Sequence, residues 1–170
     1  MLPQTTPTLK TGLHGIDVGK SMNKHITRQQ IITEALSWVG TPYQHQCSTK
    51  YAGCDCLGLV RGVWRTLYGF EPAPLPPYSP DWAEVGGAET LRDAAAHYLD
   101  PIPLDQAKPG DVILFRMRAD VPAKHMAILL DEDLIVHAYW GCAVTKSFLA
   151  PYWVRRRVAA YAFPHLSPTS

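Results

Sequence analysis

The stretch of sequence that decides the fold of this chain runs GCDCLGLV over residues 53–60. Asp55 is a favoured N-cap residue, because its side chain can accept a hydrogen bond from the backbone of the first helical turn. Beyond it, apolar residues recur with the spacing of one buried helical face, namely Val60, Val63, Trp64 and Leu67. The pattern predicts an amphipathic helix that begins at Cys56 and ends near Tyr68.

Cys56 on this segment is a candidate nucleophile. A cysteine in the first turn of a helix faces unpaired backbone N–H groups and the positive end of the helix dipole, and both favour the thiolate. The alternative is a buried, inert cysteine, which is common among free cysteines. The segment alone leaves both interpretations open.

Two short apolar segments downstream, residues 124–130 and 133–139, predict antiparallel strands joined by a tight turn. A turn centred on Asp131 places His125 directly opposite His137, so that both imidazoles lie on one face of the sheet with Cβ atoms about 4.5–5.5 Å apart. Ala127 on the same face is small, which leaves room for the helix that starts at Cys56.

A thiol beside two imidazoles matches the requirements of nucleophilic catalysis. Cys56 is the candidate nucleophile, His125 the base and later the general acid, and His137 the group that orients the base. Two alternatives remain: the histidines are ordinary core residues, or they form a zinc site with Cys47, Cys54 and Cys56. The cysteine spacing lacks the C-x-x-C pair typical of zinc knuckles, which disfavours the metal site.

Four segments resemble, in order, the NlpC family of papain-like cysteine peptidases (the p-sixty superfamily). They are GTPY at 40–43, DCLGLV at 55–60, KPGDVILF at 108–115 and KHMAI at 124–128. His137 falls where the family places its third polar residue. The resemblance implies an α+β fold of papain-like type, in which the nucleophile helix follows an N-terminal helix and packs on a C-terminal antiparallel sheet.

The resemblance also implies an activity and a substrate. Family members cut peptidoglycan stem peptides without a metal or organic cofactor, and the bond implied here joins γ-D-glutamate to meso-diaminopimelate. Tyr43 and Asp55 are implied to contribute to oxyanion or substrate binding. Leu57 stands where a serine is usual, and the glycines that usually follow the tyrosine are replaced around Gln46 and Cys47. The details of the substrate cleft therefore depart from the family pattern.

Residues 56–69 and 76–82 resemble a subgroup that is encoded with phage tails, prophages and gene transfer agents. This likeness implies a tail-associated wall peptidase with phage-like tail proteins as partners. Two other functions remain open for this fold: a tail-assembly protein that has lost hydrolysis, and a thiol amidase or acyltransferase.

The composition agrees with one domain of this kind. The chain has 170 residues and a formal net charge of +1, which does not favour nucleic acid as the main partner. Residues 155–157 are a run of three arginines, which we expect on a solvated edge strand. No stretch is apolar enough to insert in a membrane, and residues 1–20 lack a signal-peptide pattern. We therefore expect synthesis in the cytoplasm and delivery to the cell wall in a phage-like particle.

We expect a flexible tail over residues 1–25 with an alternative start at Met22, a peptidase domain over 26–166 and a short tail over 167–170. A helix is predicted from Thr27 to Val39 and another over 89–99. The first should bury four residues, Ile31, Ala35, Leu36 and Val39. Further strands are expected at 112–116, 142–148 and 154–163. Helices that precede antiparallel strands indicate an α+β domain.

Overall fold

The computed structural model describes residues 25–72 and 88–168. The expected tail before residue 25, the alternative start Met22, the segment 76–82 and the last two residues lie outside this part of the chain. The helices are α2 (Arg28–Leu36), α3 (Cys56–Tyr68), α4 (Thr90–Tyr98), α5 (Pro151–Val154) and the 3-10 turn η1 (Leu104–Gln106). The strands are β1 (Ser48–Thr49), β2 (Gly53–Cys54), β3 (Asp100–Ile102), β4 (Val112–Phe115), β5 (His125–Asp131), β6 (Leu134–Ala138), β7 (Val144–Phe148) and β8 (Arg157–Ala162).

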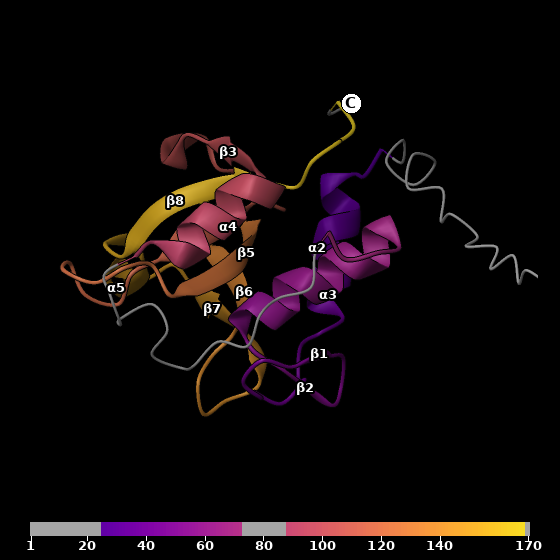
Figure 1. The fold of residues 1–170 in the computed structure, drawn as a ribbon, viewed down its shortest axis with the longest axis horizontal. Coiled ribbons are helices and arrows are strands. Elements are labelled where there is room, and N and C mark those ends of the chain that lie inside the picture. Colours follow the sequence, from indigo (N-terminus) through magenta and orange to yellow (C-terminus); the bar gives the residue numbers. More distant parts are fainter. Residues whose placement is uncertain (1–24, 73–87, 169–170) are drawn as a thin grey trace, which may run out of the picture.

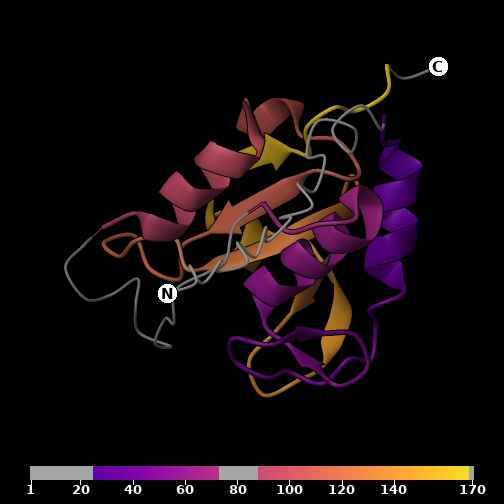
Figure 2. The ribbon, with the colours of Figure 1, turned by 45° about the vertical axis from the view of Figure 1, so that its right-hand side comes forward.

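Strands β3 to β8 form one antiparallel sheet in the order β3-β8-β4-β5-β6-β7, while β1 and β2 form a separate small hairpin. Helices α2 and α3 lie side by side against the sheet, and α4 contacts β3 and β8 (Figures 1 and 2). This arrangement confirms the predicted α+β fold, with Cys56 as the first residue of a helix that packs on the sheet. Within the described ranges, no helix is long and apolar enough to cross a membrane.

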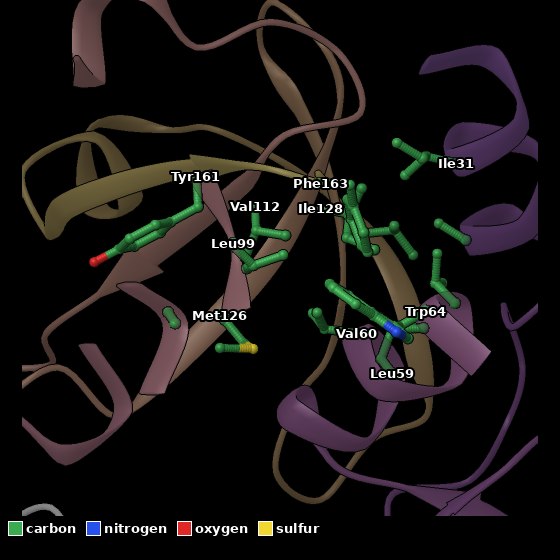
Figure 3. Close-up of a cluster of buried hydrophobic side chains, with 14 of the residues drawn as sticks. Ile31, Leu59, Val60, Trp64, Leu99, Val112, Met126, Ile128, Tyr161 and Phe163 are labelled. Atoms are coloured by element: carbon green, nitrogen blue, oxygen red, sulfur yellow. The ribbon is translucent and has the colours of Figure 1, made fainter. Parts of the chain in front are cut away.

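The sequence pattern of α3 is realised as predicted. The Asp55 side chain accepts a hydrogen bond of 2.7 Å from the backbone N–H of Gly58, and Gly69 ends the helix in the left-handed conformation with φ 84°. The predicted apolar face is buried and meets the sheet residues Met126 and Ile128 in the main core (Figure 3). Burial of this face supplies most of the stability of such a helix, since propensity alone contributes little.

Gly58 permits a close approach between α3 and the loop before it. A Cβ atom at this position would lie 1.9 Å from the carbonyl oxygen of Cys47. One turn further along α3, a Cβ atom at Gly62 would lie 2.1 Å from the ring of Trp38. The two glycines therefore let the loop at Cys47 and the ring of Trp38, which follows α2, pack directly on the backbone of α3.

Helix α2 begins at the predicted N-cap but ends earlier than predicted. Thr27 and Gln30 form a reciprocal capping box. Ile31 and Ala35 are buried as expected, whereas Leu36 and Val39 are 39% and 40% exposed, contrary to the prediction. The helix ends at Leu36, so its period does not extend to Val39, and Trp38 enters the core instead.

Two strand predictions also need correction. The turn between β5 and β6 lies at residues 132–133 rather than at Asp131, because Asp131 pairs with Leu134. A β-bulge between Leu129 and Asp131 then changes the register by one residue, and Leu129 pairs with Ile135 rather than with residue 133. His137 is therefore two residues from the position opposite His125, although both remain on one face. The arginine run does not lie on an edge strand: β8 begins at Arg157 and lies between β3 and β4.

Candidate active site

The thiol of Cys56 lies against the backbone that carries His125. The Sγ–H group donates to the carbonyl oxygen of Lys124 over 3.9 Å. The backbone N–H groups of Met126 and Leu57 face the sulfur and act to lower the pKa of the thiol. Lys124 and Met126 flank His125 in the chain, so the helix start and the histidine strand meet at one point.

Helix α3 does not pack on the histidine face of the sheet. It packs on the face of Met126 and Ile128, whereas Ala127 belongs to a second core on the other face, together with Trp153 of α5. The expectation that Ala127 makes room for the Cys56 helix is therefore wrong, because Trp153 packs on that side. Within the described residues, the strand pairing between β5 and β6 ends at the pair of Ile128 and Val136, and no pair is formed nearer the start of β5. At Met126, the side of β5 that faces β6 therefore has no strand partner in the described part of the chain, and the sulfur of Cys56 can approach it there.

The two histidines form a continuous hydrogen-bonded chain with a serine. His125 Nε2 lies 2.8 Å from His137 Nδ1, and His137 Nε2 lies 2.9 Å from Ser147 Oγ. Both contacts use ring nitrogens, whose donor and acceptor roles depend on the tautomer. The contacts engage Nε2 of His125, so Nδ1 is the ring nitrogen left to exchange a proton with a thiol.

Trp153 encloses both imidazoles. Its ring stacks on His125 with centroids 5.4 Å apart and meets the edge of His137 at 5.2 Å. Phe115 and Tyr139 complete the aromatic surroundings of His125. This packing fixes the ring orientations and excludes water from the imidazoles, which disfavours their charged forms.

Burial determines the resting charges of the site. It raises the pKa of the Cys56 thiol to about 12, and the neighbouring Asp55 carboxylate adds to the rise. The backbone N–H groups at the helix start lower the thiol pKa as expected, but burial outweighs them. Burial lowers the pKa of His125 to about 3, with a further contribution from His137, and lowers the pKa of His137 to about 4. At neutral pH the resting thiol and both imidazoles are therefore uncharged.

Tyr43 lies near the Cys56 thiol, and a backbone hydrogen bond and a ring contact hold it in place. Its N–H donates to the carbonyl oxygen of Cys142 over 3.0 Å, and its ring contacts Trp140 with centroids 5.3 Å apart. Burial, together with the nearby Cys56, raises the pKa of the Tyr43 hydroxyl to about 12. The phenol therefore keeps its proton at neutral pH and can act as a hydrogen-bond donor.

Asp55 is buried and joins the preceding loop to the helix start. One carboxylate oxygen accepts from Gly58 N–H, and the other accepts from Gln46 N–H, both over 2.7 Å. The same carboxylate lies 3.6 Å from Nδ1 of His45. These contacts hold the loop around Gln46 next to the nucleophile.

The zinc alternative has no matching geometry in the described residues. Within residues 25–72 and 88–168, no group of three or more His, Cys, Asp or Glu side chains is arranged to hold a metal ion. All four cysteines are free thiols: Cys47, Cys54, Cys56 and Cys142.

Comparison with known proteins identifies the family. The sequence profile of the NlpC/P60 family matches residues 40–161, which include all the residues of the histidine chain and Cys56. The chain belongs to the NlpC/P60 family. Members of this family are cysteine peptidases and amidases.

Individual NlpC/P60 relatives agree with this assignment. The chain is 28% identical over 138 residues to the gamma-DL-glutamyl hydrolase of Bacillus subtilis, a match that covers 81% of this chain but only 30% of that protein. It is 26% identical over 128 residues to the probable endopeptidase NlpC of Escherichia coli, covering 72% of each. The crystal structure of the NlpC/p60 domain of peptidoglycan hydrolase SagA shares the fold, with a TM-score of 0.57 and 22% identity over 81% of this chain and 100% of that chain.

The structure thus places Cys56 against the backbone of the strand that carries His125, and it brings His125 within hydrogen-bond distance of His137. Asp55 precedes Cys56 in the chain, and Tyr43 lies near the thiol. The sequence did not single out Ser147 or Trp153. The alternation of β7 places Ser147 on the face of His137, but a serine in an exposed strand carries no signal of its own. Trp153 reaches the site only through the short helix α5, which the sequence did not predict.

Proposed function

We propose that this NlpC/P60 protein is a cysteine endopeptidase that cleaves peptidoglycan stem peptides between the γ-carboxyl of D-glutamate and meso-diaminopimelate. The observation that carries the proposal is the hydrogen-bonded chain of His125 and His137 beside the helix-start thiol of Cys56. Nucleophile, base and orienting group are the parts that thiol acyl transfer requires. The names of the relatives, a glutamyl hydrolase, a probable endopeptidase and a peptidoglycan hydrolase, support this substrate class.

In the proposed reaction, Nδ1 of His125 accepts the thiol proton of Cys56 as the sulfur attacks the γ-glutamyl carbonyl. The imidazolium then donates this proton to the leaving amine of diaminopimelate, and the glutamyl group remains on the sulfur as a thioester. His125 next takes a proton from water, the hydroxide attacks the thioester, and the returning proton restores the thiol. His137 holds the ring of His125 throughout.

The oxyanion formed in each step needs hydrogen-bond donors. The backbone N–H groups at the start of α3 face the sulfur, and Tyr43 offers a protonated hydroxyl near it. We assign oxyanion stabilisation to these donors. We assign to Asp55 a substrate-binding role, as a carboxylate that fixes the loop around Gln46 at the edge of the site.

The test is digestion of purified diaminopimelate-type peptidoglycan, with the products identified by mass spectrometry. We expect fragments that end in D-glutamate from the native protein and none from Cys56→Ala, which should keep the native circular dichroism spectrum. Cys142→Ala is the matched control, because Cys142 is an exposed free thiol, and it should retain full activity. Hydrolysis by Cys56→Ala would refute the mechanism, and release of sugars or of lysine peptides would refute the substrate.

We further propose that the enzyme acts on the cell wall as a component of a phage-like tail, on the likeness of residues 56–69 to tail-associated peptidases. Co-purification with tail proteins expressed from neighbouring genes would support this role. A folded protein that cleaves no wall peptide would favour the non-hydrolytic assembly function. Transfer of the acyl group to an amine in place of water would favour the acyltransferase.

A further inference from the structure

A third polar residue continues the pair of histidines across the sheet. His125, His137 and Ser147 lie on the consecutive strands β5, β6 and β7. The two contacts between them measure 2.8 and 2.9 Å. Ser147 pairs in register with Ile135, so it lies diagonally from His137, whereas Thr145 lies directly opposite His137. Diagonal neighbours on one face of a sheet are within reach of long side chains.

A neutral imidazole carries one N–H, so this chain can run in two directions. In the first, His137 donates from Nε2 to Ser147 and accepts at Nδ1 from His125, which leaves Nδ1 of His125 unprotonated. In the second, Ser147 donates to His137, His137 donates to His125, and Nδ1 of His125 carries the proton. Only the first direction gives His125 a lone pair that can accept the proton of Cys56.

We propose that Ser147 is a positioning residue that accepts the hydrogen bond of His137 and thereby keeps His125 in the tautomer that can act as a base. Ser147 is half-buried, so its own hydroxyl proton can point to solvent while its oxygen accepts from His137. Thr145 has a hydroxyl on the same strand, but that hydroxyl bonds to the carbonyl oxygen of Lys146. The inference rests on the proposed function for its catalytic consequence, whereas the tautomer itself is independent of any substrate.

The tautomer can be read directly by nitrogen NMR of histidine-labelled protein in the Cys56→Ala background. We expect His125 and His137 to carry their protons on Nε2 at neutral pH. Ser147→Ala should convert part of the His125 population to the Nδ1-protonated form, while Ser147→Thr should preserve the native tautomer. Thr145→Val is the matched control on the same strand and should leave both tautomers unchanged. Nδ1 protonation of His125 in the native sequence, or no change in Ser147→Ala, would overturn the proposal.

Kinetics on the stem peptide supply the second measurement. Ser147→Ala should lower kcat about tenfold, the rate equivalent of one hydrogen bond, with little change in KM. Ser147→Thr should restore most of the rate. A protein that shows the expected tautomers but cleaves no peptide would refute the proposed function and leave the role of Ser147 in place. Normal cleavage by a folded Ser147→Ala variant would refute the role of Ser147 and leave the proposed function in place.

Discussion

Lowering the pH should destabilise this protein through its two buried histidines. The pKa of His125 is lowered to about 3 and that of His137 to about 4 in the folded state, both by burial. In the unfolded chain both return to an ordinary value near 6.5. Between these values the unfolded state binds more protons than the folded state, so stability falls as the pH decreases. The stabilisation is fully present above the unfolded pKa and is lost as the pH falls toward the folded pKa.

The size of this loss in the free energy of unfolding is set by protonation of the histidines in the unfolded state. From about pH 7 to about pH 5.5, an unfolded histidine goes from about one-quarter to about nine-tenths protonated, while the folded histidines stay neutral. Each histidine should therefore remove about 1.2 kcal/mol from the free energy of unfolding over this interval, and the two together about 2.5 kcal/mol. The result depends little on the folded values, because both lie well below about pH 5.5.

Urea unfolding of the native protein and of His137→Asn at the two pH values measures the effect. Asparagine keeps a polar side chain at this position and does not titrate. We expect the variant to lose about 1.2 kcal/mol less than the native protein on acidification. His97→Asn, on the exposed side of α4, is the control substitution at a histidine away from the site. Equal losses in the native protein and in His137→Asn would refute the burial of His137 as a neutral group.

Two further predictions concern catalysis and packing. Both His125→Ala and His137→Ala should lower kcat on the stem peptide, but the loss should be smaller for His137→Ala, because an orienting group is partly replaceable; equal and complete losses in folded proteins would contradict the assigned roles. Gly58→Ala should lower the free energy of unfolding by about 1–3 kcal/mol, because its Cβ would lie 1.9 Å from the backbone oxygen of Cys47. Chemical denaturation measures the second effect, and an unchanged stability would show that the loop moves away at no cost.

The part of the site that could be predicted depends on local patterns. The N-cap at Asp55 and the apolar period after it specify α3 from residues that are adjacent in sequence, and the structure confirms both. Alternation in two neighbouring strands was enough to place His125 and His137 on one face. The predicted register was wrong by two residues, because the turn lies at residues 132–133 rather than at Asp131 and a bulge between Leu129 and Asp131 takes back one of the three residues of that shift.

The rest of the site depends on segments that come together only in the folded sheet. Strand β3, which contains Pro101, was not predicted from the sequence; an edge strand tolerates a proline, and β3 pairs with residues 160–162 of β8. β8 is therefore an inner strand, and of the three arginines only Arg157 belongs to it, because Arg155 and Arg156 lie between α5 and β8. Trp153 reaches the histidines through a single helical turn that starts with Pro151, in a segment for which the sequence predicted no element.

The burial that makes the site sensitive to acid also bears on the proposed mechanism. With a neutral thiol at rest, transfer of its proton to His125 would separate charge between two buried groups. The free-energy cost of this charge separation is lowered when hydrogen-bond donors and acceptors already surround the two groups. Such fixed dipoles need no reorganisation as the charge develops. In the proposed mechanism, the backbone N–H groups around Cys56 face the developing negative charge, and Nδ1 of His137 accepts a hydrogen bond from Nε2–H of the His125 imidazolium. In this mechanism the helix start would stabilise the thiolate during attack, when the charge develops, without a preformed ion pair.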